Sequence, residues 1–176
     1  MERTPAYVLG YCKKSRRLSL ACPHLLPRMS QPSPHWEVNV CLVGHAGCAG
    51  LTWDDLSLVD GGYGTRPPVW SHVIVQAGNL RHAFPFRYPT SGRRIGHLDG
   101  LFALPRARAI FVGTFTWGGR RGTVVLAPDF PAGGEQGDHL IFRWRNGGID
   151  FAVGLHGWEP LSQTFSTLHQ MVISIR

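Results

Sequence analysis

The chain has 176 residues, 43% hydrophobic and 16% charged, which predicts a single folded domain with one core. The charged fraction is below the roughly 25% of an average domain, so disorder driven by charge is excluded. The formal net charge of +7 raises nucleic acid or an anionic surface as partners. However, 16 of the 18 basic residues are arginines, a bias that GC-rich coding also produces. The 22 glycines and 13 prolines favour turns and short strands over long helices.

The N-terminal segment, residues 1–35, is predicted to be irregular. Five prolines interrupt it, and each one fixes φ and removes a backbone donor. A basic run precedes a short apolar stretch at 18–22, which is too short for the core of a signal peptide. No window of the chain is apolar enough for a transmembrane segment. Residues 36–176 are predicted to form a single globular α+β domain.

The four cysteines fall into two local pairs, which predict the disulfides Cys12–Cys22 and Cys41–Cys48. Of the three connectivities that four cysteines allow, this one closes the shortest loops. An even number of cysteines is typical of an oxidising compartment. Zinc knuckles have two to four residues between ligands, and nine and six intervening residues do not match that spacing. Unpaired buried thiols and a metal site remain as alternatives.

Hydrophobic alternation predicts an antiparallel sheet of about six to eight strands. The first strand is expected from Trp36 to Leu42, followed by a Gly-rich loop around Cys48 and a short strand at 56–59. A buried strand is expected at 69–76, then a long loop over 78–108 with a short edge strand at 83–88. Two hairpins follow, at 109–126 with a four-residue connection over 118–121, and at 139–155 with a glycine turn.

The last element is predicted to be a helix, because apolar residues recur at steps of four and three. They are Leu161, Phe165, Leu168, Val172 and Ile175. The predicted fold class is therefore α+β: a single domain with a twisted antiparallel sheet and one C-terminal helix packed on a face.

The C-terminal third combines a Trp-bearing strand, a glycine turn, a strand with an aromatic residue and the terminal helix. The residues that carry this pattern are Phe142, Trp144, Phe151, Val153, Leu168 and Ile175. It resembles the endings of uncharacterised exported domains of high-GC bacteria, and is similar in outline to PsbP-like and related lipoprotein domains. The resemblance covers about 40 of 176 residues. It implies a sheet with a terminal helix, and it transfers no catalytic or binding residue.

Nine histidines are the clearest candidates for acid–base or metal chemistry. None of them forms an HxH, HxxxH or HExxH motif, so no two lie on one face of a local element. His139 and His156 lie at the two ends of the second hairpin and are expected to be neighbours, with Asp138 placed to orient an imidazole. These residues and His72 form one candidate site. The alternative is hairpin-end histidines that bond only to solvent or backbone.

The arginines supply a second candidate surface. Arg143 and Arg145 are expected on the solvent face of one strand, and Arg120 and Arg121 at the tip of the first hairpin. Together they predict an anion-binding face, with an ordinary solvated surface as the alternative. No nucleophile elbow, P-loop or dinucleotide fingerprint is present in the sequence.

The function favoured by the sequence is that of a non-enzymatic domain that binds a protein or small-molecule partner through the loop at 78–108. The cysteines favour an extracellular or cell-envelope location, and reduced cysteines would instead indicate the cytoplasm. No cofactor is expected, and nucleic acid is the least favoured partner. One alternative is a hydrolase or metal-dependent enzyme that uses His72, His139 or His156. The other is anion or nucleic-acid binding through the arginine pairs.

Overall fold

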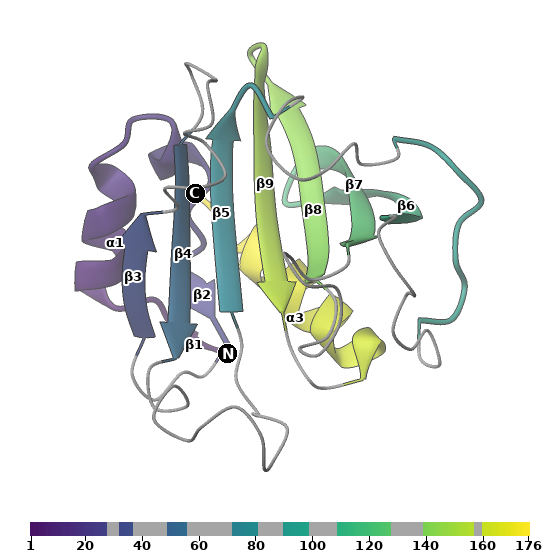
Figure 1. The fold of residues 1–176 in the computed structure, drawn as a ribbon, viewed down its shortest axis with the longest axis horizontal. Coiled ribbons are helices and arrows are strands. Elements are labelled where there is room, and N and C mark those ends of the chain that lie inside the picture. The colour runs from purple at the N-terminus through teal and green to yellow at the C-terminus, as the bar shows by residue number, and fades with distance from the viewer. Residues whose placement is uncertain are drawn as a thin grey trace.

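The computed structural model describes residues 1–27, 32–36, 49–55, 72–80, 90–98, 109–127, 139–156 and 160–176. Within these ranges the main feature is a seven-stranded antiparallel sheet, in the order β3-β4-β5-β9-β8-β7-β6 (Figure 1). The strands are β3 (Pro32–Trp36), β4 (Ala49–Asp55), β5 (His72–Gly78), β6 (Ile110–Trp117), β7 (Arg120–Ala127), β8 (His139–Asn146) and β9 (Ile149–His156).

The strand order inserts β9 between two elements that are far apart in the sequence. After β5 the chain reaches the far edge of the sheet at β6 and returns through β7, β8 and β9. β9 then pairs with β5, with Val75 opposite Val153. This closure joins the first and second halves of the chain in one sheet. It places the start of β5, the start of β8 and the end of β9 at the same edge of the sheet.

Helix α3 (Leu161–Ile173) packs on one face of this sheet, against β8, β9 and β6. Leu168 and Val172 of the predicted stripe are buried, and Met171 is buried beside them. The helix ends at Ile173, so Ile175 lies beyond it, although its side chain still enters the core. The predicted fold class is confirmed: an α+β domain with an antiparallel sheet and a C-terminal helix on one face.

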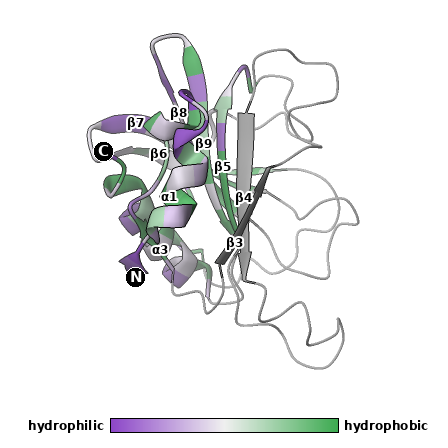
Figure 2. Ribbon diagram, turned by 90° about the vertical axis from the view of Figure 1, so that its left-hand side faces the viewer, coloured by the Kyte–Doolittle hydropathy of each residue, from purple (hydrophilic) through white to green (hydrophobic). Residues whose placement is uncertain are grey.

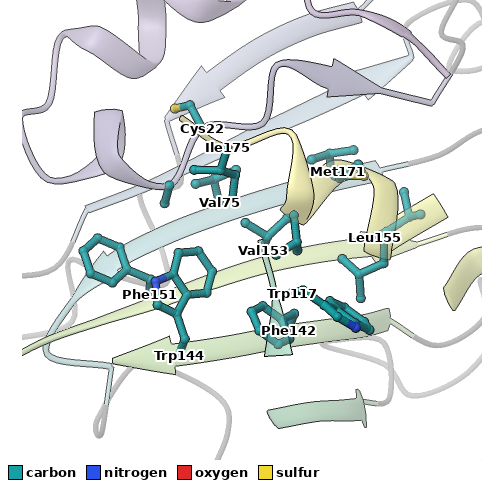
Figure 3. Packing of buried hydrophobic residues seen from close by; sticks show 14 of the residues in the cluster. Cys22, Val75, Trp117, Phe142, Trp144, Phe151, Val153, Leu155, Met171 and Ile175 are labelled. Atoms are coloured by element: carbon teal, nitrogen blue, oxygen red, sulfur yellow. The ribbon is translucent and has the colours of Figure 1, made fainter. Parts of the chain in front are cut away.

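Aromatic rings stack on one another on the side of the sheet that α3 covers. Trp117 stacks on Phe142 with ring centroids 4.7 Å apart, and Trp144 stacks on Phe151 at 5.2 Å (Figure 3). Phe165 of α3 meets Trp117 edge-on at 5.2 Å. Such stacked and edge-to-face pairs stabilise a core beyond the area that they bury. The prediction of which side of the second hairpin faces the core is therefore confirmed.

The prediction of an irregular segment over 1–35 is wrong for most of its length. It contains β1 (Glu2–Arg3), helix α1 (Ala6–Lys13), the 3-10 helix η1 (Leu18–Leu20) and β2 (Leu25–Leu26), and its end lies inside β3. Pro5 does not break a helix here, because it occupies the N-cap of α1 with φ −56°, where no backbone donor is needed. Helices α1 and α3 lie on the same side of the sheet (Figure 2). Val8, Leu18 and Leu26 belong to the same core cluster as the sheet residues.

A disulfide joins Cys12 in α1 to Cys22, with the two Cα atoms 6.2 Å apart, as predicted. Cys41 and Cys48 lie outside the described residues, and so do the predicted strands at 56–59 and 83–88 and residues 37–42 of the first strand. β4 occupies 49–55, directly after the position where a Gly-rich loop was expected. None of the helices in the described ranges is long and apolar enough to cross a membrane.

The connection in the first hairpin is shorter than predicted. Gly118 and Gly119, with φ 54° and 77°, make a two-residue turn that requires positive φ at both positions. Arg120 and Arg121 therefore belong to β7 and pair with Trp117 and Thr116. Because Arg120 and Arg121 are neighbours within a strand, they lie on opposite faces of the sheet.

Candidate functional site

The two faces of the sheet differ in what covers them. Side chains alternate between faces along a strand, and the core residues Val73, Leu155 and Leu140 all lie on the side of α3. We call this side the α3 face. Along each strand, the residues that alternate with these core residues belong to the opposite side of the sheet, which we call the far face. Figure 2 shows that α1 and α3 both lie on the α3 face.

Three histidines lie at one level of the backbone of three neighbouring strands. His72 of β5 is the direct partner of His156 of β9, and His156 is also the direct partner of His139 of β8. The expected proximity of His139 and His156 is thus present in the backbone register, and His72 joins them. We call these three residues the histidine row. Asp138 lies outside the described residues.

Next to the histidine row, the far face is apolar. Gly154 is the partner of both Ile74 and Ile141, and a Cβ at Gly154 would lie 3.2 Å from Ile141 Cγ1. Ile141 is 5% exposed, and Val125 on the next strand is fully buried. This apolar band separates the histidine row from the charged residues further along the same strands.

The four arginines of the predicted anion face do not share one surface. Register and alternation place Arg121, Arg143 and Arg145 on the far face. Arg120 lies on the α3 face, because it pairs with Trp117. Its guanidinium donates to the carbonyl oxygens of Gly118 at 2.9 Å and Ile175 at 3.2 Å. The prediction that Arg120 belongs to this face is wrong, because a two-residue turn moves it into the strand.

Not all of the positive charge of Arg121, Arg143 and Arg145 is available to a ligand. Arg145 forms an ion pair with Asp150, with 3.7 Å between Nε and Oδ1. Arg143 is half-buried, and it pairs in register with Thr123. Arg121 is exposed. The far face therefore has less free positive charge than the sequence suggested.

Part of the long loop at 78–108 is described, and it lies at the edge of the sheet. Over 90–98 the chain runs beside β6, where the Ile95 amide donates to the Val112 carbonyl at 3.0 Å. The Arg94 guanidinium lies over the Phe115 ring, 5.0 Å from its centroid. Arg93, Arg94 and His97 are exposed. The loop thus presents cationic groups on a backbone attached to the outermost strand.

His24, outside the histidine row, lies where β2 meets the end of α3. The backbone N–H groups of His24 and Leu25 both donate to Ser174 Oγ at 3.0 Å, which attaches β2 to the end of α3. Burial lowers the pKa of His24, and the positive charges of Arg176 and Lys13 lower it further. Where side chains are described, no three His, Cys, Asp or Glu residues converge on a metal site. The histidine row is placed by its backbone register.

No family model, curated protein or solved structure matches the chain. The resemblance to PsbP-like domains therefore stays a prediction. The sequence grouped the three histidines as candidates but gave no signal for the β5–β9 pairing that makes His72 and His156 direct partners. It also did not indicate that 90–98 lies along β6.

Proposed function

We propose that the protein is a non-enzymatic, exported or envelope-associated binding domain that contacts an acidic protein partner through its central segment, residues 78–108. The observation that carries the proposal is the placement of 90–98 along the edge strand β6, with Arg93 and Arg94 exposed. Binding residues are often located on loops that a rigid scaffold positions. The sheet provides such a scaffold here.

The distribution of charge favours an acidic partner. Residues 78–108 contain six arginines and one aspartate, which is five of the seven net positive charges of the chain. GC-rich coding explains the use of arginine in place of lysine, but it does not explain this uneven distribution. Arginine clusters recognise carboxylates well, because the guanidinium offers paired donors to both oxygens.

The packing around Arg94 indicates that its side chain is held in position. Arg94 lies over Phe115, and the Phe115 ring contacts Trp117 and Phe165 with centroids 5.3 and 5.2 Å away. The aromatic core thus limits where this guanidinium can lie. A side chain that is already positioned loses less conformational entropy when a partner binds.

The Cys12–Cys22 disulfide supports an oxidising compartment, where such bonds form and persist. The arginine alternative receives less support, since Arg120 and Arg145 are engaged by carbonyl oxygens and by Asp150.

The test compares two double variants that remove equal charge. A labelled polyglutamate peptide is titrated into the wild-type chain, into Arg93→Ala/Arg94→Ala, and into Arg16→Ala/Arg17→Ala, whose arginines are exposed near η1. The first variant should weaken binding about tenfold or more, as expected for the loss of charge-assisted hydrogen bonds. The second should change it less than about twofold.

Equal losses in both variants would mean that net charge alone attracts the peptide, and they would contradict the proposal. Tighter binding of duplex DNA than of the peptide at physiological salt would contradict the acidic protein partner.

A further inference from the structure

We propose that the surface of α1 and η1 binds a membrane surface that contains anionic phospholipids. The exposed side chains there are of two kinds, basic and apolar. Together they form what we call the basic face: Tyr7, Lys13, Lys14, Arg16, Arg17 and Leu20. Tyr7 and Leu20 are 53% and 54% exposed, more than any other large hydrophobic side chain in the described ranges. Basic residues combined with exposed apolar groups are typical of helices that lie in a membrane interface.

Burial on the inner side determines which residues of this segment face outwards. Val8 of α1 is fully buried, and Figure 1 shows this helix at the left-hand edge of the molecule. Tyr7 and Lys14 are about two helical turns apart, so they share the exposed side. Arg17, the N-cap of η1, and Leu20 are three residues apart and exposed, and residues at this spacing share a side of a 3-10 helix. Charged and apolar groups therefore lie together on the outer side of both helices.

The backbone that carries the four basic residues is constrained. The Cys12–Cys22 disulfide encloses all four in one loop. Within this loop, Ser19 Oγ donates to the Arg16 carbonyl at 2.8 Å, and the Ser19 amide donates to the Ser15 carbonyl at 3.0 Å. A loop that is already held in one shape loses less conformational entropy when it binds a surface.

The charge of this part of the chain has one sign. Residues 3–36 contain six Lys or Arg residues and no Asp or Glu. Lys13 and Lys14 are the only lysines among the 18 basic residues of the chain, so a coding bias that favours arginine does not explain them. Each basic residue close to an anionic membrane increases the affinity about fivefold. The charge of the basic face therefore complements an anionic bilayer.

The exposed apolar residues favour a bilayer over a soluble polyanion. Tyrosine is enriched at membrane interfaces, and an exposed leucine such as Leu20 gains free energy when it enters the acyl boundary. A soluble acidic peptide offers charge without an apolar phase. The basic face is also separate from the segment at 90–98, since α1 contacts the edge strand β3, whereas that segment lies beside β6 at the other edge. Either proposal can fail without the other.

Sedimentation with lipid vesicles tests the basic face. The full chain is mixed, at physiological salt and without reductant, with vesicles of phosphatidylcholine alone or with about one third phosphatidylglycerol. The wild type should bind the second kind and not the first. Lys13→Gln/Lys14→Gln should weaken binding at least about tenfold. Arg121→Gln/Arg145→Gln removes equal charge from exposed positions of the far face and should change binding less than about twofold, because charges more than a Debye length from the bilayer are screened.

Leu20→Ser tests the apolar part of the face at constant charge. It should weaken binding about fivefold, because one exposed leucine no longer enters the bilayer. Circular dichroism and the unfolding temperature show whether each variant folds, and Arg16→Gln/Arg17→Gln replaces the lysine variant if that one does not.

A competition experiment separates lipid from an acidic protein. Excess polyglutamate peptide should leave the chain bound to the vesicles. Release by the peptide would show that the basic face takes any soluble polyanion, and it would overturn the proposal. Absence of binding to the anionic vesicles, equal losses in the two double variants, or unchanged binding of Leu20→Ser would overturn it as well.

Discussion

The two faces of the sheet contain different kinds of residue. The described α3 face is mostly apolar, with Arg120 beside the first hairpin turn, and its aromatic side chains stack on one another. The far face changes along the strands from the apolar band of Ile141 and Gly154 to Arg143, Arg145 and Asp150. Burial of apolar surface stabilises a fold, whereas exposed charged residues at strand ends contribute little to it. We therefore expect the apolar residues of the α3 face to contribute more to stability than the charged end of the far face.

The largest expected effect is on the α3 face. Phe142→Ala removes a fully buried ring that stacks on Trp117, and it should lower the free energy of unfolding by about 3–5 kcal/mol. Arg121→Ala is the far-face control, with an expected change within about 0.5 kcal/mol. Guanidinium denaturation measures both. Similar losses in the two variants would remove the distinction between the faces.

The next largest effect concerns the N-terminal segment, which packs on the α3 side. Cys12→Ser/Cys22→Ser removes the disulfide and should cost about 3 kcal/mol, because the unfolded chain gains the freedom of the opened loop. Urea denaturation of both proteins under non-reducing conditions measures it. A loss below about 1 kcal/mol would show that α1 is held by packing alone.

A smaller effect is expected where β2 meets the end of α3. Ser174 Oγ accepts from the backbone N–H groups of His24 and Leu25 and donates to the Met171 carbonyl at 2.6 Å. Ser174→Ala leaves two donors without this partner and should cost about 1–3 kcal/mol. Ser166→Ala, at an exposed position of the same helix, is the control and should be close to neutral. Thermal unfolding separates the two, and equal melting temperatures would contradict the role given to Ser174.

The smallest effect is the pH dependence contributed by His24. Its pKa in the folded chain lies below the ordinary value of 6.5, mainly because burial disfavours the charged ring. The unfolded chain therefore binds the proton first as the pH falls, so the free energy of unfolding decreases below about pH 6.5. His24→Gln should reduce the difference in unfolding free energy between pH 7.5 and pH 5. An unchanged difference would contradict the lowered pKa.

The elements that sequence patterns predicted well are those that local periodicity determines. The stripe with Leu168 and Val172 predicted α3, and the alternation of Phe142 with Trp144 predicted the inner side of β8. The proline content led to a wrong prediction of an irregular N-terminal segment, because a proline such as Pro5 can start a helix as well as interrupt one. The turn at Gly118 and Gly119 was misjudged because the length of a hairpin loop depends on pairing as well as on glycine content.

The candidate sites were harder to predict, because their geometry depends on non-local pairing. His139 and His156 share a hairpin, so their proximity follows from the sequence alone. His72 joins them only through the β5–β9 pairing, for which the sequence contains no spacing signal. The position of 90–98 beside β6 rests in the same way on a contact between separate segments, Ile95 with Val112.

The most direct test of the proposed binding segment is the thermal unfolding of the wild type and Arg93→Ala/Arg94→Ala, each with and without excess polyglutamate peptide. A ligand that binds only the folded state raises the unfolding temperature. We expect equal unfolding temperatures for the two proteins without peptide and an upward shift with peptide in the wild type alone. An equal shift in both proteins, no shift in either, or a large loss of stability in the peptide-free variant would contradict the account.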